Sequence, residues 1–116
     1  MNLRSRYSLD TELIASAISR WAEIESPSYD SAAVNRMMDA ASSFMTTMGA
    51  RIERISGSDN FGDVVTARFG SISTQGILVL GHLDTVHLVG TLQDTLPIRV
   101  EGDRLYGPGV MDMKGG

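Results

Sequence analysis

Apolar and polar residues in the first half of the chain recur with the period of two amphipathic helices. Over residues 10–25, the apolar positions that share one helical face are Leu13, Ile14, Ala17, Ile18, Trp21 and Ala22. Asp10 is a favourable N-cap, and Pro27 ends the pattern because it disfavours helical backbone in the residue before it. The pattern predicts a first helix from residue 10 to about residue 25.

The same period continues after a polar break. A cap at Asp30 or Ser31 opens a second predicted helix that runs through Met48, where Gly49 suits the position after the helix. Its predicted inner face consists of Val34, Met37, Met38, Ala41, Met45 and Met48. Methionines also form adaptable binding surfaces, but helical spacing of this kind is typical of an ordinary core face, which we favour.

The second half of the chain has the pattern of strands and turns. Residues 50–55 and 63–69 flank a turn at residues 56–62, and residues 96–101 and 104–106 flank Gly102 and Asp103, so each pair predicts a hairpin. The continuous apolar run of residues 76–81 predicts a strand buried on both faces. Together these elements predict an α/β fold in which two helices are followed by a mixed sheet.

Composition narrows the function classes. The 116 residues carry a formal net charge of -4 and scattered basic residues, which argues against a nucleic-acid-binding surface or an anionic-membrane patch. No apolar run is long enough to cross a bilayer. The apolar segment that a signal peptide needs after its basic start does not follow Arg4 and Arg6, so we expect no signal peptide and a cytoplasmic location. Because the chain has no cysteine, any metal must be held by His, Asp or Glu, and His82 and His87 are the only histidines.

Two acidic residues and one histidine stand out chemically. His82 and Asp84 follow the apolar run two positions apart, so extended backbone would place them on one side, where a carboxylate can orient a metal-binding histidine. Asp112 lies in a glycine-rich stretch and could bridge two cations or merely cap a turn. Taken alone, His82 and Asp84 could equally be two polar surface residues without a metal-binding role. We interpret His87 as a loop residue, with a residue that lines the binding cleft as the alternative.

Three successive segments resemble the signatures of one family. They are residues 81–86 (GHLDTV), residues 100–109 (VEGDRLYGPG) and residues 112–116 (DMKGG). In this order they resemble the co-catalytic zinc exopeptidase and deacylase family, which includes glutamate carboxypeptidases, acetylornithine deacetylase, succinyl-diaminopimelate desuccinylase and aminoacylases. The resemblance is strongest to the glutamate carboxypeptidase branch and is specific from about residue 76 onward.

The resemblance implies a role for each matching residue. His82 would bind one of two zinc ions, Asp84 would be the catalytic carboxylate that orients His82, and Asp112 would bridge both ions next to a cis peptide bond with Met113. The resemblance also implies a metallopeptidase-type hydrolase that cleaves a peptide or an N-acyl amino acid. C-terminal glutamate is one candidate for the released amino acid. Substrate-binding residues are not identified.

The resemblance also implies that residues 1–116 are part of a catalytic domain. The family's other ligands, its general base, and its lid and dimerisation domain with the homodimer interface would lie beyond Gly116. Since zinc usually takes four ligands, we expect this chain alone to bind zinc weakly or not at all and to show no turnover. The alternatives are a non-catalytic folding or interaction module, and an unrelated α/β domain with chance motifs, which three ordered signatures argue against.

Overall fold

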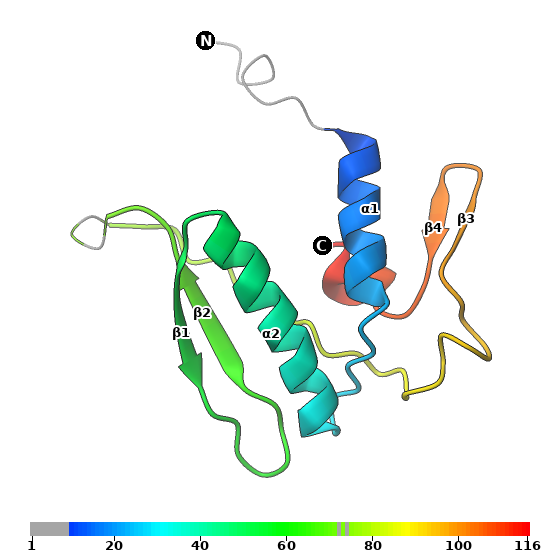
Figure 1. Cartoon of the computed structure of the whole chain (residues 1–116), viewed down its shortest axis with the longest axis horizontal. Helices are drawn as coiled ribbons and strands as arrows, with labels where there is room; N and C mark the ends of the chain where they lie inside the picture. The colour runs from blue at the N-terminus through cyan, green and yellow to red at the C-terminus, as the bar shows by residue number, and fades with distance from the viewer. Residues whose placement is uncertain (1–9, 72, 74) are drawn as a thin grey trace.

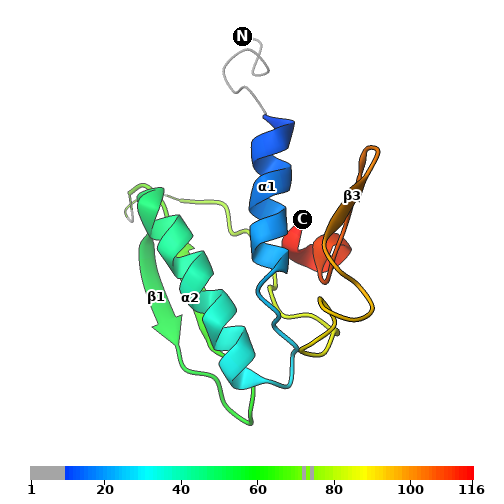
Figure 2. The same ribbon diagram turned by 45° about the vertical axis from the view of Figure 1, so that its right-hand side comes forward.

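The computed structural model describes residues 10–71, 73 and 75–116, so the expectation of no signal peptide at residues 1–9 falls outside the described part. Its elements are α1 (Thr11–Ala22), α2 (Ser31–Thr47), β1 (Arg51–Ile55), β2 (Val64–Arg68), β3 (Arg99–Glu101), β4 (Arg104–Tyr106) and a terminal π-helical turn, η2 (Val110–Lys114). Helix α2 lies along the β1–β2 hairpin, whereas α1 lies against η2, with the β3–β4 hairpin beyond (Figures 1 and 2). None of the described helices is long and apolar enough to cross a membrane.

Helix α1 begins where the sequence predicts and ends earlier. The carboxylate of Asp10 accepts hydrogen bonds from the backbone N–H groups of Glu12 and Leu13, which confirms the N-cap. The helix ends at Ala22 rather than near residue 25 because the chain turns away to pair with a distant segment around Thr85. The predicted apolar stripe is fully buried only at Ala22. Leu13 is 68% exposed, so the stripe lies outside the core over the first turn of the helix.

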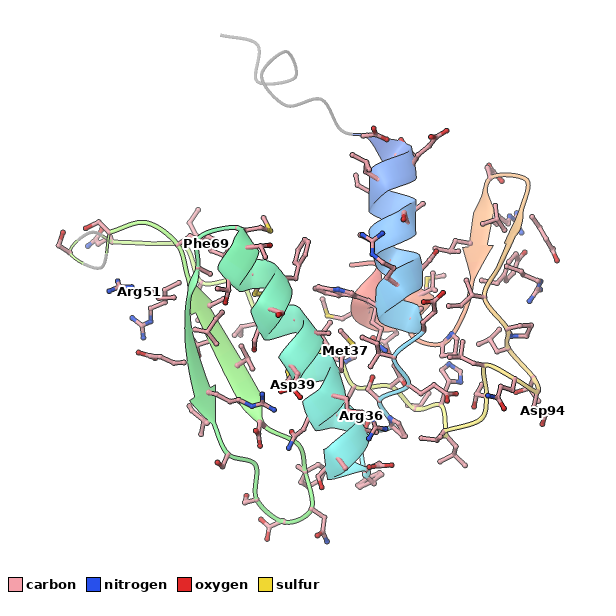
Figure 3. The ribbon with its side chains drawn as sticks, in the orientation of Figure 1. Arg36, Met37, Asp39, Arg51, Phe69 and Asp94 are labelled. Atoms are coloured by element: carbon pink, nitrogen blue, oxygen red, sulfur yellow. The ribbon has the colours of Figure 1, made fainter. Side chains whose placement is uncertain are left out.

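Helix α2 follows its prediction closely. The Asp30 side chain accepts from the Ala33 N–H, and Gly49 adopts the left-handed backbone expected after the helix, with φ of 90°. Met37 is completely buried, and Figure 3 places it on the side of α2 nearer α1. The core-face interpretation of the methionine stripe is therefore confirmed there, while Met48, at 59% exposure, lies outside the core.

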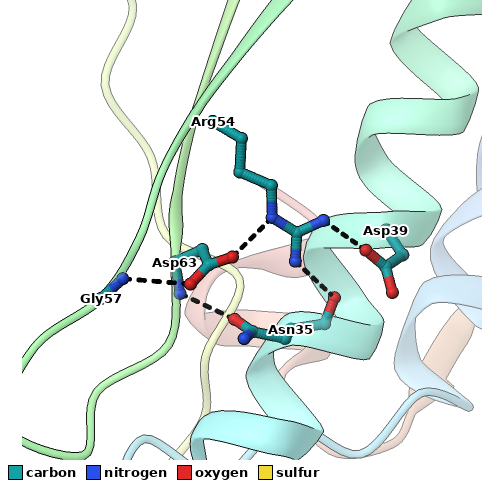
Figure 4. Close-up of polar contacts among 5 residues, drawn as sticks. All are labelled: Asn35, Asp39, Arg54, Gly57 and Asp63. Atoms are coloured by element: carbon teal, nitrogen blue, oxygen red, sulfur yellow. Dashed lines mark hydrogen bonds and ion pairs between the residues drawn. The ribbon is translucent and has the colours of Figure 1, made fainter.

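Strands β1 and β2 pair antiparallel, as predicted, with a polar network joining them to α2. The Arg54 guanidinium contacts the carboxylate of Asp39 on α2 and donates from Nε to Asp63 Oδ2 at 2.6 Å (Figure 4). The N–H of Asp63 donates to the Asn35 side chain at 2.7 Å. The N–H of Gly57 and then Arg54 hold the pKa of Asp63 below its usual value.

The predicted central strand and mixed sheet were wrong. Residues 76–81 form no strand, and Ile77, Leu78, Val79 and Leu80 are 79–95% exposed. The sheets are two separate antiparallel pairs, β1–β2 and β3–β4. A strand requires a hydrogen-bonding neighbour, and within the described residues the hairpin strands pair only with each other. The β3–β4 hairpin itself is confirmed, with β3 beginning at Arg99 and the turn at Gly102, whose φ is 62°.

Candidate metal centre

The two family motifs meet at a pair of side chains. Nε2 of His82 lies 2.9 Å from Oδ1 of Asp112. The Asp112 backbone departs from helical geometry inside η2, with φ of -133° and ψ of 98°, and its peptide bond to Met113 is cis, as the resemblance implied. Both side chains remain accessible, with 47% of His82 and 78% of Asp112 exposed. A ligand could therefore reach the pair from solvent.

Asp84 contacts the other ring nitrogen of His82. Nδ1 lies 3.1 Å from the Asp84 carbonyl oxygen and 3.3 Å from the carboxylate oxygen Oδ1. Residue 84 thus faces Nδ1 with both its backbone and its side chain, while Asp112 faces Nε2. The structure brings together all three site residues named from the sequence.

The charge state of the histidine follows from these contacts. Carbonyl and ionised carboxylate oxygens only accept hydrogen bonds, so an imidazole that donates to both sides must be protonated. The Asp84 carbonyl, and next the Asp112 carboxylate, raise the pKa of His82 above its usual 6.5. A cation that replaces the Nε2 proton would meet one imidazole nitrogen and one carboxylate oxygen.

These donor atoms fit zinc, which binds histidine nitrogen and carboxylate oxygen, usually four ligands in all. In the described part of the chain, no group of three or more His, Cys, Asp or Glu side chains is close enough to hold a metal. His82 and Asp112 could therefore supply two of the four ligands that zinc usually takes.

Two further residues fix the Asp112 loop in place. The Lys114 side chain is buried and donates to the carbonyls of Trp21, in the last turn of α1, at 3.1 Å and of Ile24, just after the helix, at 2.6 Å. Burial lowers the pKa of Lys114 to about 8. Gly109 has φ of 73°, and a Cβ there would lie 2.7 Å from Cγ2 of Thr85. The loop thus packs directly on the segment that carries His82.

A carboxylate also holds the loop that follows the His82 motif. Glu25 accepts hydrogen bonds from the N–H groups of Gly90, at 2.9 and 3.0 Å, and Leu92, at 3.0 Å. The Gly90 N–H is the main cause that lowers the pKa of Glu25. Sequence reasoning missed Glu25, Lys114 and Ser28, a residue that contacts Asp84, because their partners lie 56 to 93 positions away.

Comparison with known proteins finds similar sequences, although no family model matches the chain. A 55-residue stretch, 47% of the chain, is 44% identical to carboxypeptidase G2 of Pseudomonas sp. (strain RS-16). A 55-residue stretch is also 44% identical to the putative succinyl-diaminopimelate desuccinylase DapE of Mycobacterium tuberculosis (strain ATCC 25618 / H37Rv). These matches support the resemblance of this stretch to the co-catalytic zinc exopeptidase and deacylase family. The matches span only 13% and 14% of the length of these two family members.

Proposed function

We propose that His82 and Asp112 are metal ligands of a zinc-dependent hydrolase that cleaves amide bonds, and that Asp84 orients His82. The observation that carries this proposal is the convergence of an imidazole nitrogen and a carboxylate oxygen, 2.9 Å apart, from two family motifs. Asp84 faces the opposite nitrogen with its backbone carbonyl at 3.1 Å and its carboxylate at 3.3 Å, and a metal-binding histidine commonly donates its other ring proton to such an acceptor.

The relatives suggest the substrate class. One is named a carboxypeptidase and the other a putative desuccinylase, and both names describe cleavage next to an amide carbonyl. We infer a peptide or N-acyl amino acid substrate with a free carboxylate, with C-terminal glutamate as the first candidate. When bound, zinc polarises such a carbonyl and activates water. The exposed Asp112 carboxylate has a second oxygen, which supports a bridging role between two ions.

The residues of this chain have separable tasks in that reaction. His82 supplies the neutral Nε2 lone pair, and Asp84 accepts the proton that stays on Nδ1. Lys114 holds the Asp112 loop against α1. The sequence alone leads us to expect weak zinc binding or none. Because the structure brings two of the usual four ligands within 2.9 Å of each other, we now expect weak binding, and no turnover, by this chain alone.

Zinc titration followed by imidazole nitrogen NMR tests the proposal. The chain contains only two histidines, so His87→Ala assigns the spectrum and serves as the matched control. We expect zinc to shift Nε2 of His82 in the wild type and in His87→Ala. In Asp112→Ala the apparent affinity should fall by roughly tenfold or more, because one of two ligands is gone.

Two outcomes would contradict the metal site. One is a zinc effect confined to His87, and the other is an affinity that Asp112→Ala leaves unchanged. Either would favour the alternative of a non-catalytic module. If zinc binding behaves as expected, hydrolysis of acyl-glutamates by this chain and by a longer form tests the substrate class.

A further inference from the structure

The segment between α1 and α2 forms the support of the His82 motif. The N–H of Ser28 donates to the Thr85 carbonyl at 3.0 Å, and the N–H of Thr85 donates to the Ser26 carbonyl at 2.8 Å. Pro27 and Thr85 therefore face each other as a parallel bridge. This bridge brings two serine side chains from one segment alongside residues 83–85.

The hydroxyl of Ser28 has a specific acceptor in this bridge. Its Oγ lies 2.5 Å from Oδ2 of Asp84 and 3.2 Å from the Thr85 carbonyl. A hydroxyl has one proton, and a hydrogen bond to a carboxylate is shorter and stronger than one to a neutral carbonyl. The Ser28 proton therefore belongs to Asp84.

This hydrogen bond divides the two carboxylate oxygens between two partners. Oδ2 accepts from Ser28, and Oδ1 lies 3.3 Å from Nδ1 of His82. The Asp84 side chain is 38% exposed, so without Ser28 solvent could turn the carboxylate away from the ring. The Ser28 contact selects the rotamer in which Oδ1 faces the histidine.

We propose that Ser28 is a positioning residue, which acts through Asp84 to hold His82 in the orientation that binds metal. The metal-binding part of this inference rests on the proposed function, while the orientation of Asp84 does not. Partners one step beyond the metal ligands typically change affinity tenfold to a hundredfold, so a residue one step further should change it about threefold to tenfold.

Ser26 offers a matched control in the same segment. It is completely buried, and its hydroxyl donates to the Leu83 carbonyl at 2.7 Å without contacting the Asp84 carboxylate. Loss of this buried hydrogen bond should weaken the fold more than loss of the half-buried Ser28 hydroxyl. Comparison of substitutions at Ser26 and Ser28 therefore distinguishes a loss of fold stability from a loss of Asp84 orientation.

The experiment compares the wild-type chain with Ser28→Ala, Ser28→Thr and Ser26→Ala. Three-bond NMR couplings to the Asp84 β-protons, measured without metal, report whether that side chain keeps one rotamer. We expect the couplings to report a single Asp84 rotamer in the wild type and in Ser26→Ala. In Ser28→Ala the couplings should take values averaged over several rotamers. Ser28→Thr restores the hydroxyl and should restore the single rotamer. Thermal unfolding of each variant gives the accompanying loss of stability, which should be largest for Ser26→Ala.

Zinc titration of the same variants supplies the second measurement. Ser28→Ala should weaken zinc binding about threefold to tenfold, and Ser26→Ala should not, at a temperature where both are folded. Unchanged Asp84 couplings in Ser28→Ala would overturn the proposal whether or not zinc binds. If Ser28→Ala averages the Asp84 couplings but leaves the zinc affinity unchanged, the claim that Ser28 supports metal binding would be overturned. If the wild type binds no zinc, the proposed function fails, and the couplings still decide the role of Ser28.

Discussion

Nε2 of His82 lies 2.9 Å from Oδ1 of Asp112, although the two residues are 30 positions apart in the chain. His82 follows an exposed segment without regular secondary structure, and Asp112 lies in η2, which packs against α1. Their contact depends on the bridge to residues 26–28 on one side and on Lys114 on the other. The predictions below test the charges and supports that maintain this contact.

Removal of the Asp112 charge should lower the pKa of His82. In the metal-free chain the Asp84 carbonyl and the Asp112 carboxylate raise that pKa above 6.5, and Asp112→Asn removes the second cause. Because the folded pKa is raised, protonated His82 stabilises the fold at low pH, and this contribution is lost as pH rises through the folded value. NMR titration of the ring measures the change, with Asp103→Asn in the β3–β4 turn as control. An identical pKa in both variants would contradict the contact.

Lys114 should make stability rise with pH in the alkaline range. Burial lowers its pKa from 10.5 to about 8, so between these values the unfolded chain binds more protons than the folded chain. The free energy of unfolding should therefore increase from pH 8 to pH 10.5, by at most roughly 3–4 kcal/mol. Lys114 is the only lysine, so Lys114→Met should abolish this rise in denaturant unfolding measured across that range. An equal rise in the variant would show that other groups cause it.

Arg54 should stabilise the β1–β2 hairpin through its carboxylate partners. Arg54→Gln removes both ion pairs, with Asp39 and Asp63, and should lower the thermal midpoint by roughly 3–5 °C. Hydrogen exchange at the Gly57 N–H, which donates to Asp63, should become faster. The matched control is Arg68→Gln on the neighbouring strand, since Arg68 makes one exposed ion pair at 3.7 Å with Glu53. Equal effects of the two substitutions would exclude a special role for the Arg54 network.

Glu25 should protect the loop that follows the His82 motif. Glu25→Gln replaces a charged acceptor with a neutral amide, so the N–H groups of Gly90 and Leu92 should exchange roughly tenfold faster. The lowered pKa of Glu25 means that its contribution is present above about pH 4.5 and is lost as pH falls through the folded value.

Hydrogen exchange measured from pH 6 down to pH 3 checks both parts of this prediction. Glu23→Gln, at an exposed position two residues earlier, is the control and should leave both amides protected. Equal protection of Gly90 in the wild type and in Glu25→Gln would contradict the hydrogen bonds.

Local signals in the sequence were enough to predict both helices and both hairpins. The carboxylates of Asp10 and Asp30 cap their own helices, and Gly102 makes the turn between strands that adjoin it. Each of these interactions joins residues that are close along the chain, so the pattern of residues contains the information. The order of the family motifs likewise identified His82, Asp84 and Asp112 as the candidate residues.

Tertiary structure decided which distant groups meet. The apolar run of residues 76–81 has the composition of a buried strand, but strand formation depends on a neighbour that the run itself cannot specify. Ser28, Glu25 and Lys114 are ordinary polar residues in the sequence, and each acquires a role only through a partner at least 56 positions away. Periodicity and caps report local geometry, whereas the support of the His82–Asp112 pair depends on contacts that exist only once the chain has folded.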